Sequence, residues 1–166
     1  MISFENSIRI RRPVGDVFEF VSDPVNLSKW NYYVLHVEKT SSGSLGVGST
    51  FHQTRKKDQQ DLRVTEYEAN RRLSLETMGG SELKLTMRLH FEATEEGTLI
   101  RDTWKLDTGR PRILERLAAR RVMTAVGENL AKLKELLETG RTQLRDGRWV
   151  THVMQPETLA RNRYAR

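Results

Sequence analysis

A long amphipathic stretch near the end of the chain limits the accessible folds more than any other feature. Residues 110–139 carry apolar side chains at helical spacing, and Gly140 then supplies a residue suited to ending a helix. The stripe consists of Ile113, Leu114, Leu117, Met123, Val126, Leu130, Leu133, Leu136 and Leu137. We therefore expect one helix of about 45 Å whose apolar side packs against a second layer.

The residues before this stretch alternate between apolar and polar with a period of two, which is typical of half-buried strands. The clearest case is 82–92, ELKLTMRLHFE, in which every second residue is apolar. Seven strands are expected, at 2–10, 34–40, 50–56, 61–68, 73–78, 82–92 and 98–107. Because most of the connections are short, the strands should form one antiparallel sheet, and the chain should be a two-layer α+β protein.

Residues 12–31, RPVGDVFEFVSDPVNLSKWN, interrupt the strands with two short helices. Pro13 and Pro24 each suit the start of a helix, and Asp23 is a good cap for the second. Trp30 follows on the apolar side of the second helix. It is expected to pack over the mouth of the sheet, and stacking against a ligand is the alternative.

The order of one strand, two short helices, six strands and a long helix resembles the START-like (SRPBCC) superfamily, in particular its bacterial polyketide cyclase/dehydrase-like branch. The matching residues are Arg12-Pro13, Val17-Phe18, Val21-Ser22-Asp23-Pro24, Asn26, Trp30-Asn31, Gly46-Val47-Gly48, Val64–Glu68, Arg71–Leu73, Gly97-Thr98, Asn129-Leu130 and Leu133-Lys134. The resemblance implies a helix-grip fold, in which a curved seven-stranded antiparallel sheet wraps around the long helix. It also implies a hydrophobic cavity between sheet and helix, partly closed by the two short helices.

Composition divides the chain into a domain at 1–139 and a basic tail at 140–166. The tail holds six arginines against Asp146 and Glu157, and so carries +4 of the net charge of +6. Within it, RWVTHVM at 148–154 fits a strand on a sheet edge or a mobile segment equally well. Binding of nucleic acid or an anionic membrane through this tail is a weaker hypothesis.

The composition also excludes several classes of protein. No cysteine is present, which rules out disulfides, thiolate metal sites and a cysteine nucleophile. The start of the chain has no signal-peptide pattern, and no apolar run reaches the ~18 residues that span a bilayer, so we expect a cytoplasmic protein. The four histidines show no helical metal-ligand spacing, and neither a metal nor another cofactor is expected.

Two polar residues interrupt apolar strand faces. Asp102 lies between Ile100 and Trp104, where a carboxyl group is costly unless it is hydrogen-bonded or borders a cavity. It is the best candidate for a proton-transfer group, and pairing with Arg120 or Arg121 is the structural alternative. Asn6 interrupts the first strand in the same way, either as a satisfied core amide or as a second polar contact for a ligand.

The expected ligand-binding residues are those that face the implied cavity: Asn6, Trp30, Leu75, Leu85, Met87, Leu89, Ile100, Asp102 and Trp104. Glu66 is expected at the rim of the cavity. The mixed patterns around His36 and His52 do not show whether these side chains point inward or outward. The sequence also leaves the oligomeric state open.

The preferred hypothesis is a protein that binds or carries a small hydrophobic molecule such as a lipid, a polyketide-like aromatic or an isoprenoid. A polyketide aromatase/cyclase is the alternative, although acid–base catalysis needs two positioned groups and only Asp102 is evident. A regulatory protein that acts through its tail is the third hypothesis.

Overall fold

The structure is a computed structural model that describes residues 1–80, 84–107, 109 and 111–153. Leu83 of the expected strand at 82–92, and Arg161, Arg163 and Arg166 of the tail, lie outside these residues. Among the residues described, no helix is both long and apolar enough to cross a membrane.

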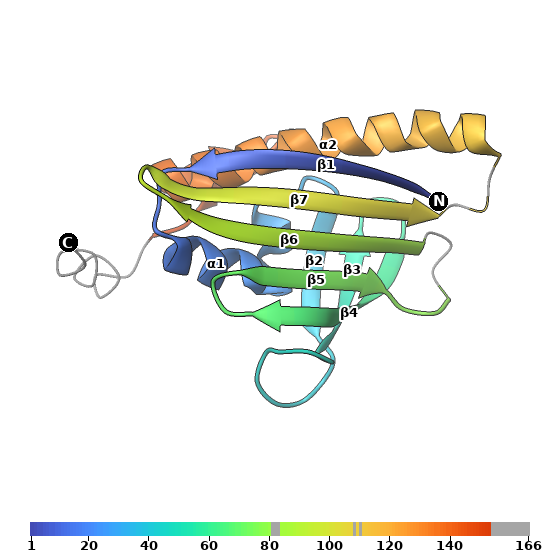
Figure 1. The fold of residues 1–166 in the computed structure, drawn as a ribbon, viewed down its shortest axis with the longest axis horizontal. Coiled ribbons are helices and arrows are strands. Elements are labelled where there is room, and N and C mark those ends of the chain that lie inside the picture. Colours follow the sequence, from blue (N-terminus) through green and yellow to red (C-terminus); the bar gives the residue numbers. More distant parts are fainter. Residues whose placement is uncertain (81–83, 108, 110, 154–166) are drawn as a thin grey trace.

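Seven antiparallel strands form one curved sheet, as the alternating segments predicted (Figure 1). Their spatial order is β1-β7-β6-β5-β4-β3-β2, so the first two strands of the chain form the two edges. The strands are β1 (Ile2–Ile10), β2 (Val34–Lys39), β3 (Thr50–Arg55), β4 (Gln59–Glu68), β5 (Arg72–Thr77), β6 (Lys84–Thr94) and β7 (Gly97–Asp107).

The helices also occur where they were expected. Helix α1 (Val14–Ser22) and the 3-10 helix η1 (Pro24–Lys29) follow β1, and α2 (Arg112–Thr139) packs along β1. Asp23 accepts a hydrogen bond from the backbone N–H of Val25 at 3.0 Å, which confirms its predicted role as a cap. Gly140 adopts a left-handed φ of 84° and donates its N–H to Leu136, which ends α2. The observed architecture is the helix-grip fold that the resemblance implied.

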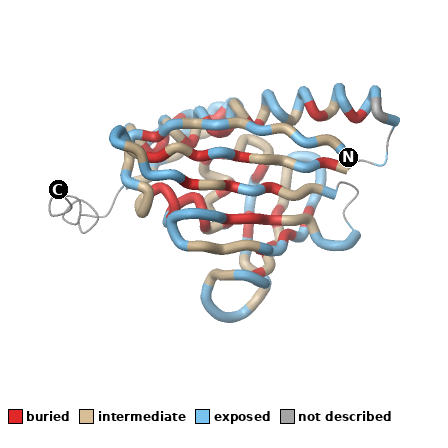
Figure 2. The backbone as a smooth tube through the Cα atoms, in the orientation of Figure 1, coloured by how far each residue is buried: buried red, intermediate tan, exposed pale blue. Residues whose placement is uncertain are grey.

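Buried and exposed residues alternate along most of the strands (Figure 2). The buried apolar side chains form one layer that packs with side chains of α1 and α2 in a single core. Arg12 joins this layer to the end of α2, because its side chain donates hydrogen bonds to the carbonyl oxygens of Leu137 and Glu138 at 2.8 and 3.2 Å. The hydroxyl of Thr98 in β7 donates to the carbonyl of Arg12 at 2.8 Å. Strand β7, the end of β1 and the end of α2 are thus connected at one point.

The expectation of a single apolar side on α2 is wrong for its first two turns. Ile113, Leu114 and Leu117 are 76%, 53% and 54% exposed, whereas Glu115 and Ala119 between and after them are buried. With 3.6 residues per turn, the three exposed side chains belong to the face that points away from the sheet. The apolar residues of α2 therefore lie on two different faces of the helix. Those in its first two turns are exposed, and the core is formed by residues later in the helix.

Residues beyond Gly140 form a hairpin of their own. Strand β8 (Arg141–Gln143) pairs with β9 (Trp149–Thr151), so a strand does form within 148–154, but it does not extend the edge of the large sheet. Thr142 and Leu144 of this hairpin are buried. The tail up to residue 153 is thereby packed on the body of the protein.

Candidate functional site

A cavity of about 110 Å³ lies between the inner face of the sheet, η1 and the middle of α2. Strands β2 to β7 contribute to its wall because their inward side chains converge as the sheet curves. Most of the lining is apolar: Leu27, Trp30, Val34, Leu62, Leu75, Leu85, Met87, Trp104, Leu106 and Val122. The remaining lining residues are polar and consist of Asn31, Gln53, Arg55 and Gln60.

Gln53 and Gln60 form a buried amide pair in this wall. They are register partners on β3 and β4, and Nε2 of Gln53 donates to Oε1 of Gln60 at 2.9 Å. Nε2 of Gln60 in turn donates to Asp58 at 3.0 Å. A buried amide pair with defined donors and acceptors can orient a ligand that carries a hydroxyl or carbonyl group.

Asn31 ties the segment after η1 to the long helix. Its Oδ1 accepts hydrogen bonds from the Tyr33 N–H at 3.0 Å and from Nδ2 of Asn129 at 3.1 Å. Oδ1 of Asn129 accepts a hydrogen bond from the N–H of Tyr32 at 3.1 Å. These bonds hold η1 over the cavity, where Trp30 and Leu27 face inward.

Arg55 brings a positive charge to the polar side of the cavity. Its Nε lies 3.5 Å from Asp58 Oδ1 and its side chain is 25% exposed, so the ion pair sits at the edge of the protein surface. An anionic or strongly polar ligand group could compete for this guanidinium.

Five of the nine expected ligand residues line the cavity, namely Trp30, Leu75, Leu85, Met87 and Trp104. The other four, Asn6, Leu89, Ile100 and Asp102, are outside the lining. Leu89 and Ile100 are core residues. Asn6 is half-buried rather than a core residue, and its Nδ2 donates to the backbone carbonyl of Met123 on α2 at 3.3 Å.

Asp102 is buried in the centre of β7, with 1% of its surface exposed. Its register neighbours are Asn6 on β1 and Leu89 on β6. Within the described part of the chain, Oδ1 has no hydrogen-bond partner, and the same holds for Nε1 of Trp104. The alternative pairing with Arg120 or Arg121 is not formed, since both arginines are exposed and Asp102 makes no ion pair among the described residues.

Burial raises the pKa of Asp102 to about 7, and the indole N–H of Trp104 offsets a smaller part of that rise. A carboxyl with this pKa can hold or release a proton near neutral pH. Trp104, two residues further along the same face of β7, lines the cavity, whereas Asp102 does not.

The other ionisable candidates lie away from the cavity. A register shift between Val64 and Glu66 turns Glu66 to the outer face, where it accepts a hydrogen bond from the Ser74 hydroxyl at 3.0 Å. His52 pairs with Asp61 at 2.7 Å on the outer side of β3 and β4, and His36 is exposed. In the described part of the chain, no cluster of three or more His, Asp or Glu side chains is arranged to hold a metal.

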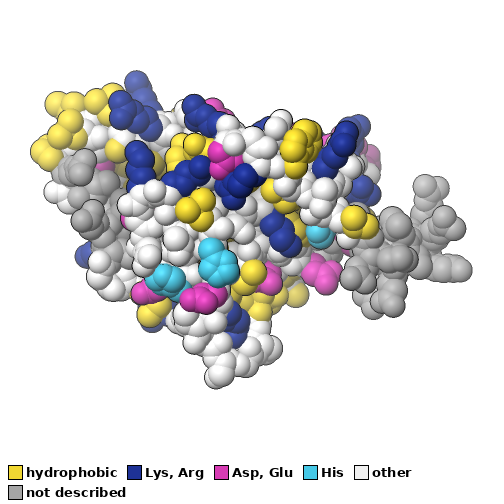
Figure 3. Space-filling model, turned by 180° about the vertical axis from the view of Figure 1, so that it is seen from behind, with side chains coloured by type: hydrophobic (Ala, Val, Ile, Leu, Met, Phe, Trp, Pro, Cys, Tyr) yellow, Lys and Arg dark blue, Asp and Glu magenta, His cyan; other side chains and the backbone are white. Residues whose placement is uncertain are grey.

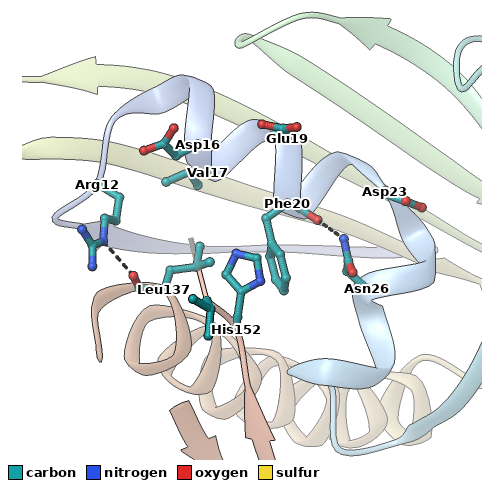
Figure 4. Close-up of a pocket in the computed structure, with 10 residues that line it drawn as sticks. Arg12, Asp16, Val17, Glu19, Phe20, Asp23, Asn26, Leu137 and His152 are labelled. Carbon is teal, nitrogen blue, oxygen red and sulfur yellow. Dashed lines mark hydrogen bonds between the residues drawn. The ribbon is translucent and has the colours of Figure 1, made fainter. Parts of the chain in front are cut away.

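A second, larger pocket of about 300 Å³ lies where the tail meets α1 (Figure 4). His152 packs against Phe20, with ring centroids 4.5 Å apart, and partial burial together with the charge of Lys29 lowers the pKa of His152. Asp16 and Glu19 border the opening. This pocket therefore lies at the contact between the tail and the domain.

Nine of the fourteen lining residues were not predicted from the sequence, and they include all four polar ones, Asn31, Gln53, Arg55 and Gln60. A signal for the amide pair was present in the sequence. Gln53 lies two residues from Phe51 on β3, and Gln60 lies two residues from Leu62 on β4, so each glutamine shares an apolar strand face. Asp102 shares the face of Ile100 in the same way. A polar residue on an apolar strand face marks each of these positions.

A curved seven-stranded sheet around a long helix, with an apolar cavity between them, defines a START-like helix-grip protein. Residues 1–138 match the family described as "Polyketide cyclase / dehydrase and lipid transport", and the chain belongs to this family. A search of curated protein sequences finds no match to the chain.

Solved structures with similar folds cover most of the chain. Protein MLL2253 from Mesorhizobium loti is 18% identical with a TM-score of 0.66, over 82% of this chain and 96% of that one. The di-domain ARO/CYC BexL of the BE-7585A biosynthetic pathway is 17% identical with a TM-score of 0.68, over 81% of this chain and 46% of that one. The Aha1 dimer from Colwellia psychrerythraea is 20% identical with a TM-score of 0.62, over 84% of this chain and 98% of that one. At these identities the likeness shows the shared fold.

Proposed function

We propose that the protein binds a small, mostly apolar molecule in the cavity between sheet and helix, with one polar group directed to the amide pair. The observation that carries this proposal is the composition of the cavity wall, in which ten apolar side chains enclose a space bordered by Gln53, Gln60, Arg55 and Asn31. Ligand sites in proteins commonly combine such an apolar wall with a few polar groups that fix orientation. A lipid, an isoprenoid or an aromatic polyketide-like molecule has this chemistry.

The volume of the cavity limits what it can hold in this conformation. An apolar cavity of roughly 150 Å³ binds benzene, and sites for drug-sized ligands occupy roughly 300–1,000 Å³. At about 110 Å³, the cavity is smaller than both, so it fits a short acyl segment as it stands and a single ring only with a slight widening. A longer ligand would require η1 or the first half of α2 to move outward.

Two measurements test the proposal. Native mass spectrometry of the unlabelled protein should show a retained small molecule. A titration with phenol, followed by NMR, should shift the indole N–H signals of Trp30 and Trp104, which line the cavity, while Trp149 on the exposed hairpin serves as an internal reference. Toluene, which has the same shape without the hydroxyl, should bind more weakly if the amide pair recognises a polar group.

A pair of matched variants separates cavity binding from surface binding. Val122→Phe adds bulk to the cavity wall and should weaken phenol binding by at least about tenfold. Val14→Phe makes the same change at a partly buried position of α1 that is outside the lining, and should leave binding unchanged. Equal effects of the two variants, or no retained molecule and no selective shift, would overturn the proposal.

A cyclase is the second candidate, because Asp102 is a buried carboxyl whose Oδ1 lacks a hydrogen-bond partner among the described residues, two positions before the cavity residue Trp104. Asp102→Asn distinguishes the two functions. A cyclase should lose conversion of its bound molecule while still retaining it, and a carrier should release its ligand chemically unchanged with either residue. Among the described lining residues there is no carboxylate or histidine to act as the second acid–base group, which favours binding.

A further inference from the structure

The first turns of α2 carry apolar side chains that the body of the protein does not cover. Ile113, Leu114 and Leu117 are each more than half exposed. Figure 1 shows that this part of α2 extends past the end of the sheet, near the N-terminus. In Figure 3 the yellow side chains gather at the corresponding end of the molecule, with dark blue ones beside them.

Positive charge surrounds these apolar side chains. Arg116, Arg120 and Arg121 are exposed on the same two to three turns, and within the described part of the chain none of them forms an ion pair. Ile113, Leu114, Leu117, Arg116, Arg120 and Arg121 are called the basic apolar face below.

The acidic residue of this segment is turned away from the basic apolar face. Glu115 is buried on the opposite side of the helix, and its Oε2 lies 3.2 Å from the N-terminal amine of Met1. The next acidic residue along α2 is Glu128, beyond the exposed segment. The outward surface of these turns therefore combines apolar and exclusively basic side chains.

We propose that the basic apolar face docks the protein onto the surface of an anionic lipid bilayer. A helix that presents leucine and isoleucine among arginines binds at the lipid interface by burying the apolar groups and by attraction to anionic headgroups. A second copy of the chain fits less well, because a symmetric contact would bring arginines together, and like charges across an interface are unfavourable. Nucleic acid would satisfy the arginines but would leave the leucines without a hydrocarbon partner.

The position of the face adds a reason for this contact. Val122, one residue after Arg121, lines the cavity from the inward side of the same helix, so docking would place the ligand site across α2 from the bilayer. The docking proposal goes beyond ligand binding and does not depend on it, because vesicle binding is measured on the protein without added ligand.

Flotation of the full chain with vesicles tests the proposal. Vesicles of phosphatidylcholine with phosphatidylglycerol should carry the protein at low salt, whereas vesicles of phosphatidylcholine alone should carry much less. Arg116→Ala with Arg120→Ala should weaken binding to anionic vesicles by about 30-fold, at about fivefold for each basic residue near an anionic surface. Ile113→Ser with Leu117→Ser should weaken it by at least about tenfold.

Three control variants test whether vesicle binding depends specifically on the basic apolar face. Arg9→Ala with Arg88→Ala removes the same charge from exposed positions on the outer face of the sheet, and Leu35→Ser with Val47→Ser removes exposed apolar groups elsewhere. Replacing Arg161, Arg163 and Arg166 by alanine tests the tail. All three controls should bind vesicles as the parent chain does.

The proposal is overturned if the controls and the face variants lose binding equally, if the tail variant alone abolishes it, or if neutral and anionic vesicles bind alike. It is also overturned if sedimentation shows a dimer that dissociates in Leu117→Ser, or if the face variants reduce binding to an oligonucleotide and not to vesicles. Circular dichroism of each variant confirms that the fold is retained.

Discussion

Replacing Asp102 by asparagine should make the protein less sensitive to pH. The pKa of this carboxyl rises from an ordinary 3.8 to about 7 in the folded protein, because burial penalises the charged form. The folded state therefore keeps a proton that the unfolded state releases at lower pH. The contribution of Asp102 to the free energy of unfolding is fully present below about pH 4. It declines as the pH rises toward 7 and stays low above that pH.

The size of the effect follows from the difference in proton affinity between the two states. At about 1.4 kcal/mol for each tenfold change, the rise in the pKa of Asp102 corresponds to about 4 kcal/mol between pH 4 and pH 8. Asp102→Asn removes the titrating group. The free energy of unfolding of the variant, minus that of the parent chain, should therefore rise by about this amount between about pH 4 and pH 8. The asparagine side chain adds N–H donors to the core. Because the amide does not titrate, their effect on the free energy of unfolding is the same at every pH.

Equilibrium urea unfolding, followed by tryptophan fluorescence at several pH values from 4 to 8, measures the difference. Glu95→Gln in the exposed β6–β7 turn is the control and should track the parent chain at each pH. A difference between Asp102→Asn and the parent that does not change with pH would refute the reasoning. It would show that the carboxyl is hydrated or partnered in the folded protein.

Three further changes test the architecture around the site. Gly97 has a φ of 140°, and a Cβ there would lie 2.2 Å from the carbonyl oxygen of Ile10, so Gly97→Ala should lower the free energy of unfolding by about 3 kcal/mol and reduce Tm in calorimetry. Arg12→Ala removes two hydrogen bonds to the last carbonyls of α2 and should cost about 2 kcal/mol in urea unfolding, with Arg12→Lys in between. Gln60→Leu leaves the Gln53 amide without its partner and should cost about 2 kcal/mol, whereas Gln53→Leu in the same chain should restore much of that loss; a double variant as unstable as the single one would contradict this account.

Much of the fold could be predicted from local pattern. Alternation over 82–92 and 98–107 predicted the two longest strands, which the structure places at 84–94 and 97–107, because side chains of a strand alternate between its two faces. Asp23-Pro24 predicted the second short helix through capping and the geometry of proline, and Gly140 predicted the end of α2. These features depend on neighbours in sequence and need no tertiary information.

The candidate site was predictable only in part. The inward positions of Leu85, Met87 and Trp104 follow from alternation, and so does the burial of Asp102. Alternation failed at Glu66, because the register shift after Val64 reverses the inward and outward faces. Such a shift arises from pairing with the neighbouring strand, which the residues of β4 alone do not reveal.

The sequence by itself determined the order of strands and helices, the ends of the helices and the apolar face of the regularly alternating strands, since these depend on residues close together in the chain. Only the tertiary structure decided that the apolar wall meets the amide pair of Gln53 and Gln60, that Asp102 is buried without the support of Arg120 or Arg121, and that the first turns of α2 lie outside the core. The physical reason is that the curvature of the sheet and the length of the helix set which side chains meet, and α2 is longer than the surface it covers.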